Sequence, residues 1–174
     1  MSAFPVLQGD CLMSSTVSSR AVWRPHVTVA CVVADGERYL MVEEEVGGRL
    51  AYNQPAGHLD DHESLARAAV RETLEETGWT VELQHLIGVH QWRSHEHGDG
   101  VVRFSFAARP LRHDPQRPLD VGIRRALWLT RAEIAALGDR LRSPLVLMSI
   151  DAWLAGQRHP LQLLGSLLDG DPYP

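Results

Sequence analysis

The stretch from Ser64 to Thr77 constrains the fold most, because it predicts a helix with two chemically different faces. It contains neither proline nor glycine and ends at Gly78, the residue type expected just past a helix C-terminus. Upstream, Asp60 and Glu63 have the spacing of a capping box. We therefore expect a helix over residues 64–77, with its first turn capped from Asp60.

One face of this predicted helix is acidic. Each helical residue advances by about 100°, which places Glu72, Glu75 and Glu76 at roughly 0°, 300° and 40° on one stripe. The opposite, more apolar face comprises Ala66, Val70, Thr73, Leu74 and Thr77. Clustered carboxylates suit Mg²⁺, a hard cation that also bridges to phosphates, although glutamates on an exposed helix are often only a solvated surface.

The segments around this helix predict a sheet. Short runs rich in β-branched residues, which favour strands, occupy residues 26–34, 38–46, 80–92, 101–108 and 126–129. Two further helices are expected over 130–137 and 144–155. No internal repeat and no interdomain linker interrupts these elements. The pattern favours the α/β class, with one mixed β-sheet flanked by helices.

Composition excludes several classes of function. All 17 basic residues are arginine, which excludes a Walker-type lysine loop and Schiff-base chemistry. The net charge of −5 lacks the basic footprint of a nucleic-acid-binding protein. Cys11 and Cys31 form no disulfide framework and no long apolar run predicts a membrane span, so we expect a cytoplasmic chain in which both cysteines are small hydrophobes.

A motif surrounds the acidic helix. Its seven positions, spread over 22 residues, are Gly57, Glu63, Arg71, Glu72, Glu75, Glu76 and Gly78. This pattern resembles the Nudix box, and the resemblance implies a Nudix-type α/β/α sandwich that hydrolyses diphosphates with Mg²⁺ or Mn²⁺.

The resemblance also implies roles for individual residues. Glu72, Glu75 and Glu76 would be metal ligands, with Gly57 contributing its carbonyl. Glu63 and Arg71 would form an ion-paired frame that orients them. Either Glu72 or Glu76 would assist deprotonation of the attacking water, and the motif does not choose between them. Thr73 and Trp79 replace the aliphatic residues usual in the box.

The similarity continues beyond the box and defines the expected domain. Residues 25–33, 53–59, 90–92, 142–146 and 155–161 resemble the NudJ-type phosphatase branch of the family. That branch removes phosphate from nucleoside tri- and diphosphates and from thiamine-type pyrophosphates. We expect a tail over 1–22, the Nudix domain over 23–164 and a C-terminal tail over 165–174. The alternative is a Nudix pyrophosphatase acting on ADP-ribose or another nucleotide conjugate, in either case as a monomer or homodimer.

Residues outside the box supply candidate substrate contacts. Because the chain lacks lysine, arginine must bind the uncovered phosphate oxygens, and Arg103 is the first candidate. Trp92 could stack on a substrate ring or be core, and Asn53 and Gln54 could hydrogen-bond substrate or cap a turn. Asp120 is a candidate additional metal ligand or a turn residue. A zinc site at His95, Glu96 and His97 lacks further ligands at suitable spacing.

Overall fold

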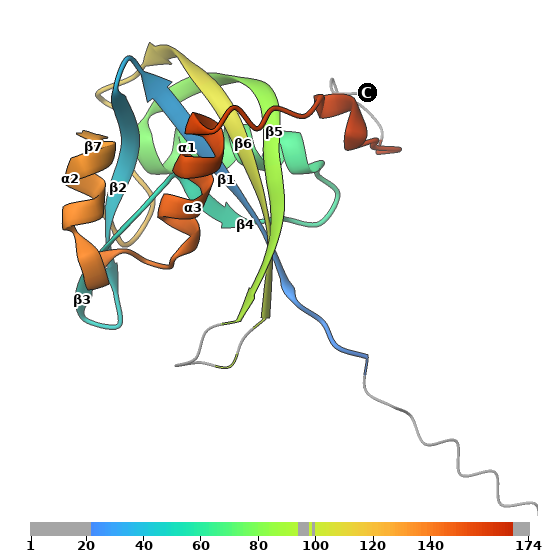
Figure 1. Cartoon of the computed structure of the whole chain (residues 1–174), viewed down its shortest axis with the longest axis horizontal. Helices are drawn as coiled ribbons and strands as arrows, with labels where there is room; N and C mark the ends of the chain where they lie inside the picture. Colours follow the sequence, from blue (N-terminus) through green and yellow to red (C-terminus); the bar gives the residue numbers. More distant parts are fainter. Residues whose placement is uncertain (1–21, 94–97, 99, 169–174) are drawn as a thin grey trace, which may run out of the picture.

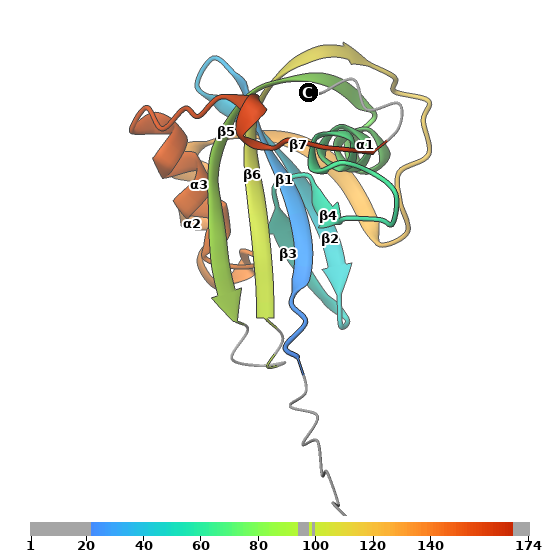
Figure 2. The same cartoon turned by 90° about the vertical axis from the view of Figure 1, so that its right-hand side faces the viewer.

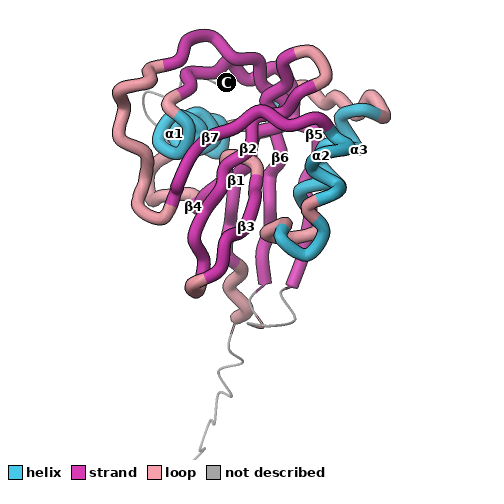
Figure 3. The backbone as a smooth tube through the Cα atoms, turned by 90° about the vertical axis from the view of Figure 1, so that its left-hand side faces the viewer, coloured by secondary structure: helices cyan, strands magenta, loops and turns pink. Residues whose placement is uncertain are grey.

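A mixed β-sheet forms the centre of the computed structural model, which describes residues 22–93, 98 and 100–168 (Figure 1). The strands are β1 (His26–Asp35), β2 (Arg38–Val46), β3 (Arg49–Asn53), β4 (Ala56–His58), β5 (Trp79–Arg93), β6 (Gly100–His113) and β7 (Ile123–Thr130). The helices are α1 (Leu65–Thr77), α2 (Arg131–Ala136) and α3 (Leu145–Leu154), with 3-10 turns at Gly138–Arg140 and Leu161–Leu163. Helix α1 covers one face of the sheet and α2 and α3 the other (Figures 2 and 3), which confirms the expected α/β/α sandwich.

The sheet splits beside strand β1. Strand β1 runs parallel to β6 in the middle of the order β3-β2-β1-β6-β5. It pairs with β2 only at their shared hairpin, where Ala34 is opposite Tyr39 and Asp35 opposite Arg38. Further along, Thr28 to Ala30 pair instead with strand β4. The separation of β2 from β1 leaves space between them, and the candidate site described below lies there.

Alternation along β1 builds a core on each side of the sheet. Successive strand side chains point to opposite faces. Val29, Cys31 and Val33 therefore pack in the cluster that contains the alanines of α1, while Val32 joins the cluster that contains Ile150 of α3. Cys31 behaves as the expected small hydrophobe, and burial raises the pKa of its thiol to about 12.

Helix α1 begins later than predicted. Its N-cap is Ser64, whose hydroxyl accepts the Arg67 N–H at 3.3 Å, so the expected cap at Asp60 is wrong. The Asp60 N–H does donate to the Glu63 carboxylate at 2.9 Å, which braces the preceding loop. The C-terminus ends as predicted, with Gly78 in the left-handed conformation at φ 70°.

The packed face of α1 is displaced from the predicted one, although Ala66, Thr73 and Thr77 are buried as predicted. Ala68 and Ala69 are fully buried, whereas Val70 and Leu74 are only partly so. Small side chains bring the helix backbone close to the sheet, and Cys31 Sγ lies 3.5 Å from the Ala69 carbonyl oxygen. The hydrophobic wheel located the helix but did not identify which small residues form its contact.

Other predicted elements agree with the structure with small shifts at their ends. The capping box of α2 is present, because Thr130 accepts the Glu133 N–H and Glu133 accepts the Thr130 N–H. Strands β3 and β4 were missed; β4 has only three residues, too few for a periodic signal. The His95–Glu96–His97 cluster, the tail up to residue 21 and residues 169–174 lie outside the described residues. No described helix is long and apolar enough to cross a membrane.

Candidate active site

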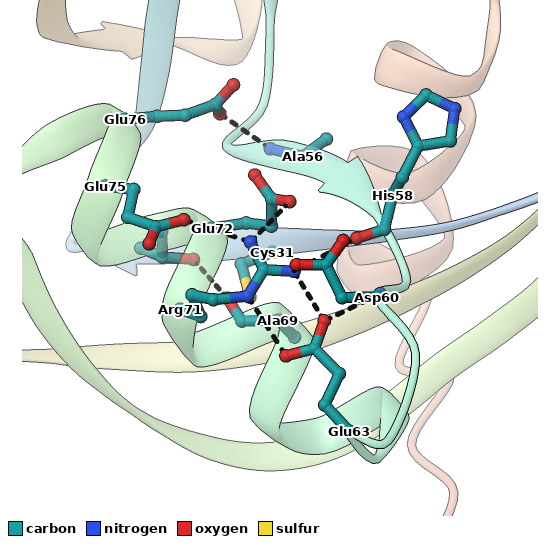
Figure 4. Close-up of polar contacts among 11 residues, drawn as sticks. Cys31, Ala56, His58, Asp60, Glu63, Ala69, Arg71, Glu72, Glu75 and Glu76 are labelled. Carbon is teal, nitrogen blue, oxygen red and sulfur yellow. Dashed lines mark hydrogen bonds and ion pairs between the residues drawn. The ribbon is translucent and has the colours of Figure 1, made fainter. Parts of the chain in front are cut away.

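Arg71 organises the acidic face of α1 (Figure 4). Its guanidinium binds Glu63 through two nitrogens, Nε at 3.0 Å and Nη2 at 2.5 Å. Its Nη1 donates to Glu72 at 2.8 Å and to Glu75 at 3.0 Å. The hydrogen bonds from Arg71 hold the pKa of Glu63 below its ordinary value and, with Glu63 as the main cause, raise that of Arg71. One cation thus fixes three carboxylates that would otherwise repel each other.

Glu72 lies against the backbone of strand β4. An added Cβ on Gly57 would be 2.1 Å from the Glu72 carboxyl carbon, which is closer than atoms can approach. Position 57 therefore has to be glycine for the Glu72 carboxylate to lie where it does. Burial raises the pKa of Glu72, while the hydrogen bond from Arg71 opposes that rise.

Glu72 and Glu75 come together with Asp120, from the loop before β7. Ligand oxygens of these three residues all lie within 4.8 Å of one another. The Asp120 N–H donates to the Glu75 carbonyl oxygen at 3.1 Å, which ties this loop to the last turn of α1. Three carboxylates at this separation, next to a close-packed glycine, are a donor set that fits a hard divalent cation.

Glu76 occupies a different position from that group. Its carboxylate accepts the Ala56 N–H at 2.8 Å and its side chain is buried between α1 and β4 (Figure 4). Burial raises the pKa of Glu76 to about 8, and the nearby charges of Glu72 and Glu44 add to the effect. The helical wheel grouped Glu76 with Glu72 and Glu75, but the turn at β4 draws its carboxylate toward the Ala56 backbone.

A cavity of about 400 Å³ opens beside Gly57, where β2 separates from β1. Its walls come from strands β1 to β6, the loop before α3 and the start of α3. The lining residues are His26, Thr28, Glu44, Asn53, Ala56, Gly57, His58, Trp92, Val101, Arg103, Arg142, Ser143 and Leu145. Cationic, polar and apolar side chains therefore surround one space next to the acidic helix.

Arg103 is the buried cation of this cavity. Arg103 is only 4% exposed, and its Nη2 donates to the Asn53 side-chain oxygen at 3.3 Å. Its Nε has no hydrogen-bond partner within the described chain. Burial lowers the pKa of Arg103 to about 10, and nearby Glu76 and Glu44 oppose that change. A buried, under-bonded guanidinium is suited to bind an anion.

The other predicted substrate contacts divide into two groups. Asn53 and Trp92 line the cavity, as Arg103 does. Gln54, the residue after β3, does not line it. This residue is 1% exposed and its side-chain amide donates to the Val146 carbonyl oxygen at 3.1 Å, so it fastens the end of β3 to helix α3. Neighbouring residues at the end of a strand point to opposite sides, which is why only one of the Asn53–Gln54 pair faces the cavity.

Sequence reasoning missed two charged residues of the cavity. Glu44 on β2 is a largely buried carboxylate, and Arg142 precedes α3. Glu44 stands in the run Glu43 to Glu45, where strand alternation alone could have assigned the middle residue to the face opposite its neighbours. Arg142 begins segment 142–146, which resembles the NudJ-type branch, but it was not singled out because a loop arginine is usually solvated.

Comparisons with known proteins agree with this geometry. A family model described as NUDIX domain matches residues 24–147. Phosphatase NudJ of Escherichia coli K12 is 43% identical over 144 residues, covering 83% of this chain and 93% of that protein. A NUDIX hydrolase from Nitrosomonas europaea has a solved structure that superposes with a TM-score of 0.82 at 42% identity, covering 85% of this chain and 100% of the other.

More distant structures share the fold. The NUDIX domain of Shewanella oneidensis NrtR, solved with ADP ribose, superposes with a TM-score of 0.60 at 15% identity, covering 80% of this chain and 94% of that one. At that identity the likeness concerns the fold alone. The family model and the relatives above 40% identity, together with the carboxylate helix and its arginine, establish that the chain belongs to the Nudix hydrolase family.

Proposed function

We propose that this chain is a Mg²⁺-dependent phosphatase that hydrolyses phosphoanhydride bonds in nucleoside tri- and diphosphates and in thiamine-type pyrophosphates. The observation that carries the proposal is the cavity beside Gly57, which brings the buried cation Arg103 next to the acidic face of α1. The 43% identity to a protein named Phosphatase NudJ supports phosphatase activity. Nudix hydrolases use divalent metals, and the donor set here is made of carboxylate oxygens.

The metal would be held by the side chains gathered on α1. We assign Glu72, Glu75 and Asp120 as ligands from their shared position. The resemblance to the Nudix box adds the Gly57 carbonyl and Glu76 to this set. Mn²⁺ would use the same oxygen donors. When bound, the cation neutralises phosphate oxygens and lowers the pKa of a bound water. Glu63 and Arg71 keep the ligands in place without contacting the substrate.

The chain's own groups would then bind the substrate and move the proton. Arg103 holds a phosphate from within the cavity, and Asn53 orients that arginine through its side-chain oxygen. Trp92 offers a flat surface to the substrate ring. Either Glu72 or Glu76 takes the proton from the attacking water. Glu76 is better placed for this role, because the Glu72 carboxylate already accepts a charged hydrogen bond that lowers its basicity.

A substrate panel tests the proposal. ATP, ADP, thiamine pyrophosphate and ADP-ribose are incubated with the protein in Mg²⁺, in Mn²⁺ and in EDTA, and orthophosphate and pyrophosphate are measured separately. We expect orthophosphate from the first three compounds, none in EDTA, and no turnover by Glu72→Gln or Glu76→Gln. Release of AMP from ADP-ribose with thiamine pyrophosphate left intact would instead support the alternative pyrophosphatase.

A further inference from the structure

Arg142 enters the same cavity from a part of the chain far from Arg103. Its backbone N–H donates to the Tyr52 carbonyl oxygen at 2.8 Å, and the preceding Leu141 pairs with Tyr52 as an isolated parallel bridge. The base of the Arg142 side chain is therefore attached to the end of strand β3, one residue from Asn53. This attachment directs Arg142 into the cavity, although the residue belongs to a loop and not to a helix or strand.

The Arg142 side chain is held at one end only. Its Nε lies 3.5 Å from Glu44 Oε1, and that oxygen has no hydrogen-bond partner in the described chain. Within the same residues, neither terminal nitrogen of Arg142 donates a hydrogen bond, and its closest ion-pair contact is made through Nε. The Arg142 side chain is 45% exposed, whereas that of Glu44 is 18% exposed. A carboxylate at the back of the guanidinium thus leaves its outer edge free for a planar, bidentate contact.

We propose, building on the proposed function, that Arg142 is a second phosphate-binding arginine and that Glu44 positions it. Arg103 on β6 and Arg142 before α3 would each contact phosphate oxygens of one substrate. The substrate class is then a polyphosphate chain with at least two phosphates, since a single phosphate offers fewer oxygens to two arginines and a metal. The competing explanation is that the pair formed by Glu44 and Arg142 only braces β2 against the loop before α3.

Substitutions at Arg142 separate these explanations. For Arg142→Ala, we expect the KM for ATP and thiamine pyrophosphate to rise about tenfold or more, with kcat changed less than about threefold. Arg142→Lys should lie between, because it keeps the charge but loses the planar fork. Calorimetric binding of inorganic tripolyphosphate in EDTA should weaken by a similar factor, and this measurement requires no turnover. Arg140→Ala is the matched control, because Arg140 lies over the Tyr52 ring and outside the cavity lining.

The outcomes distinguish this inference from the proposed function. Unchanged KM and tripolyphosphate affinity in Arg142→Ala, with a lower melting temperature, would overturn the inference and leave only a structural brace. Normal hydrolysis of the panel alongside that result would still support the proposed function. If the wild-type protein hydrolyses nothing in the panel, but tripolyphosphate affinity falls in Arg142→Ala, the proposed function fails and the arginine assignment is supported.

Discussion

Replacing Gly57 by alanine tests whether the position of the Glu72 carboxylate determines activity. The new methyl group would lie 2.1 Å from Glu72 Cδ and 2.2 Å from each carboxylate oxygen, whereas ordinary contact begins at 3.4 Å. The carboxylate must therefore move by at least about 1 Å. Misplacement of a reacting or binding group by this amount can cost about 10²-fold in rate, so we expect kcat/KM to fall by about that factor.

The same substitution should leave the fold largely intact. The clashing atoms are the end of a flexible side chain, so the strand backbone need not shift. The loss is the hydrogen bond between Arg71 and Glu72, which is worth about 1–2 kcal/mol after discounting for solvent at the partly exposed Arg71. For a chain of this size, that corresponds to a melting temperature lower by roughly 2–8 °C.

Phosphate release across a Mg²⁺ titration and a thermal melt provide the two measurements. Gly165→Ala is the control, because a Cβ at that position meets no atom within 4 Å. We expect it to match the wild type in both assays. If Gly57→Ala also retained wild-type kcat/KM and the same dependence on Mg²⁺, the Glu72 carboxylate would not act from the position described here, and the proposed ligand assignment would be wrong.

Three further predictions follow from the same site. Glu63→Gln weakens the two-nitrogen contact with Arg71, so kcat/KM should fall by about 10–100-fold, and wild-type activity would show that the ion-paired frame is dispensable. Burial raises the pKa of Glu76 in the folded protein from 4.5 to about 8, so this carboxyl group destabilises the metal-free fold increasingly as the pH rises between those values. Glu76→Gln should therefore raise the melting temperature in EDTA more at pH 9 than at pH 5.5. An equal gain at both pH values would contradict the burial argument. Arg103→Met should raise KM about tenfold or more without lowering the melting temperature, because it removes a buried charge that has little direct pairing. Steady-state kinetics measures the KM and a thermal melt measures the stability. An unchanged KM would remove Arg103 from the substrate contacts.

The parts of the fold that the sequence predicted correctly depend mostly on short stretches of neighbouring residues. The helix ending at Gly78, the hairpin of β1 and β2 and the capping box at Thr130 all depend on residues close together in the chain. Such short-range signals are sufficient because backbone conformation and capping involve only a few neighbours. Strand β4 escaped prediction because its three residues are held by pairing with β1, which is distant in sequence.

The chain's sequence by itself determined which chemical groups are available: a helix with clustered carboxylates, a glycine before it and arginine as its only basic side chain of fixed charge. Tertiary structure alone decided how those groups divide. It brought Asp120 to Glu72 and Glu75, drew Glu76 to the Ala56 backbone, turned Gln54 away from the cavity and placed Glu44 and Arg142 within it. The physical reason is that helical spacing fixes only the direction of a side chain relative to its own helix. The residues that this side chain meets depend on how the sheet opens between β1 and β2.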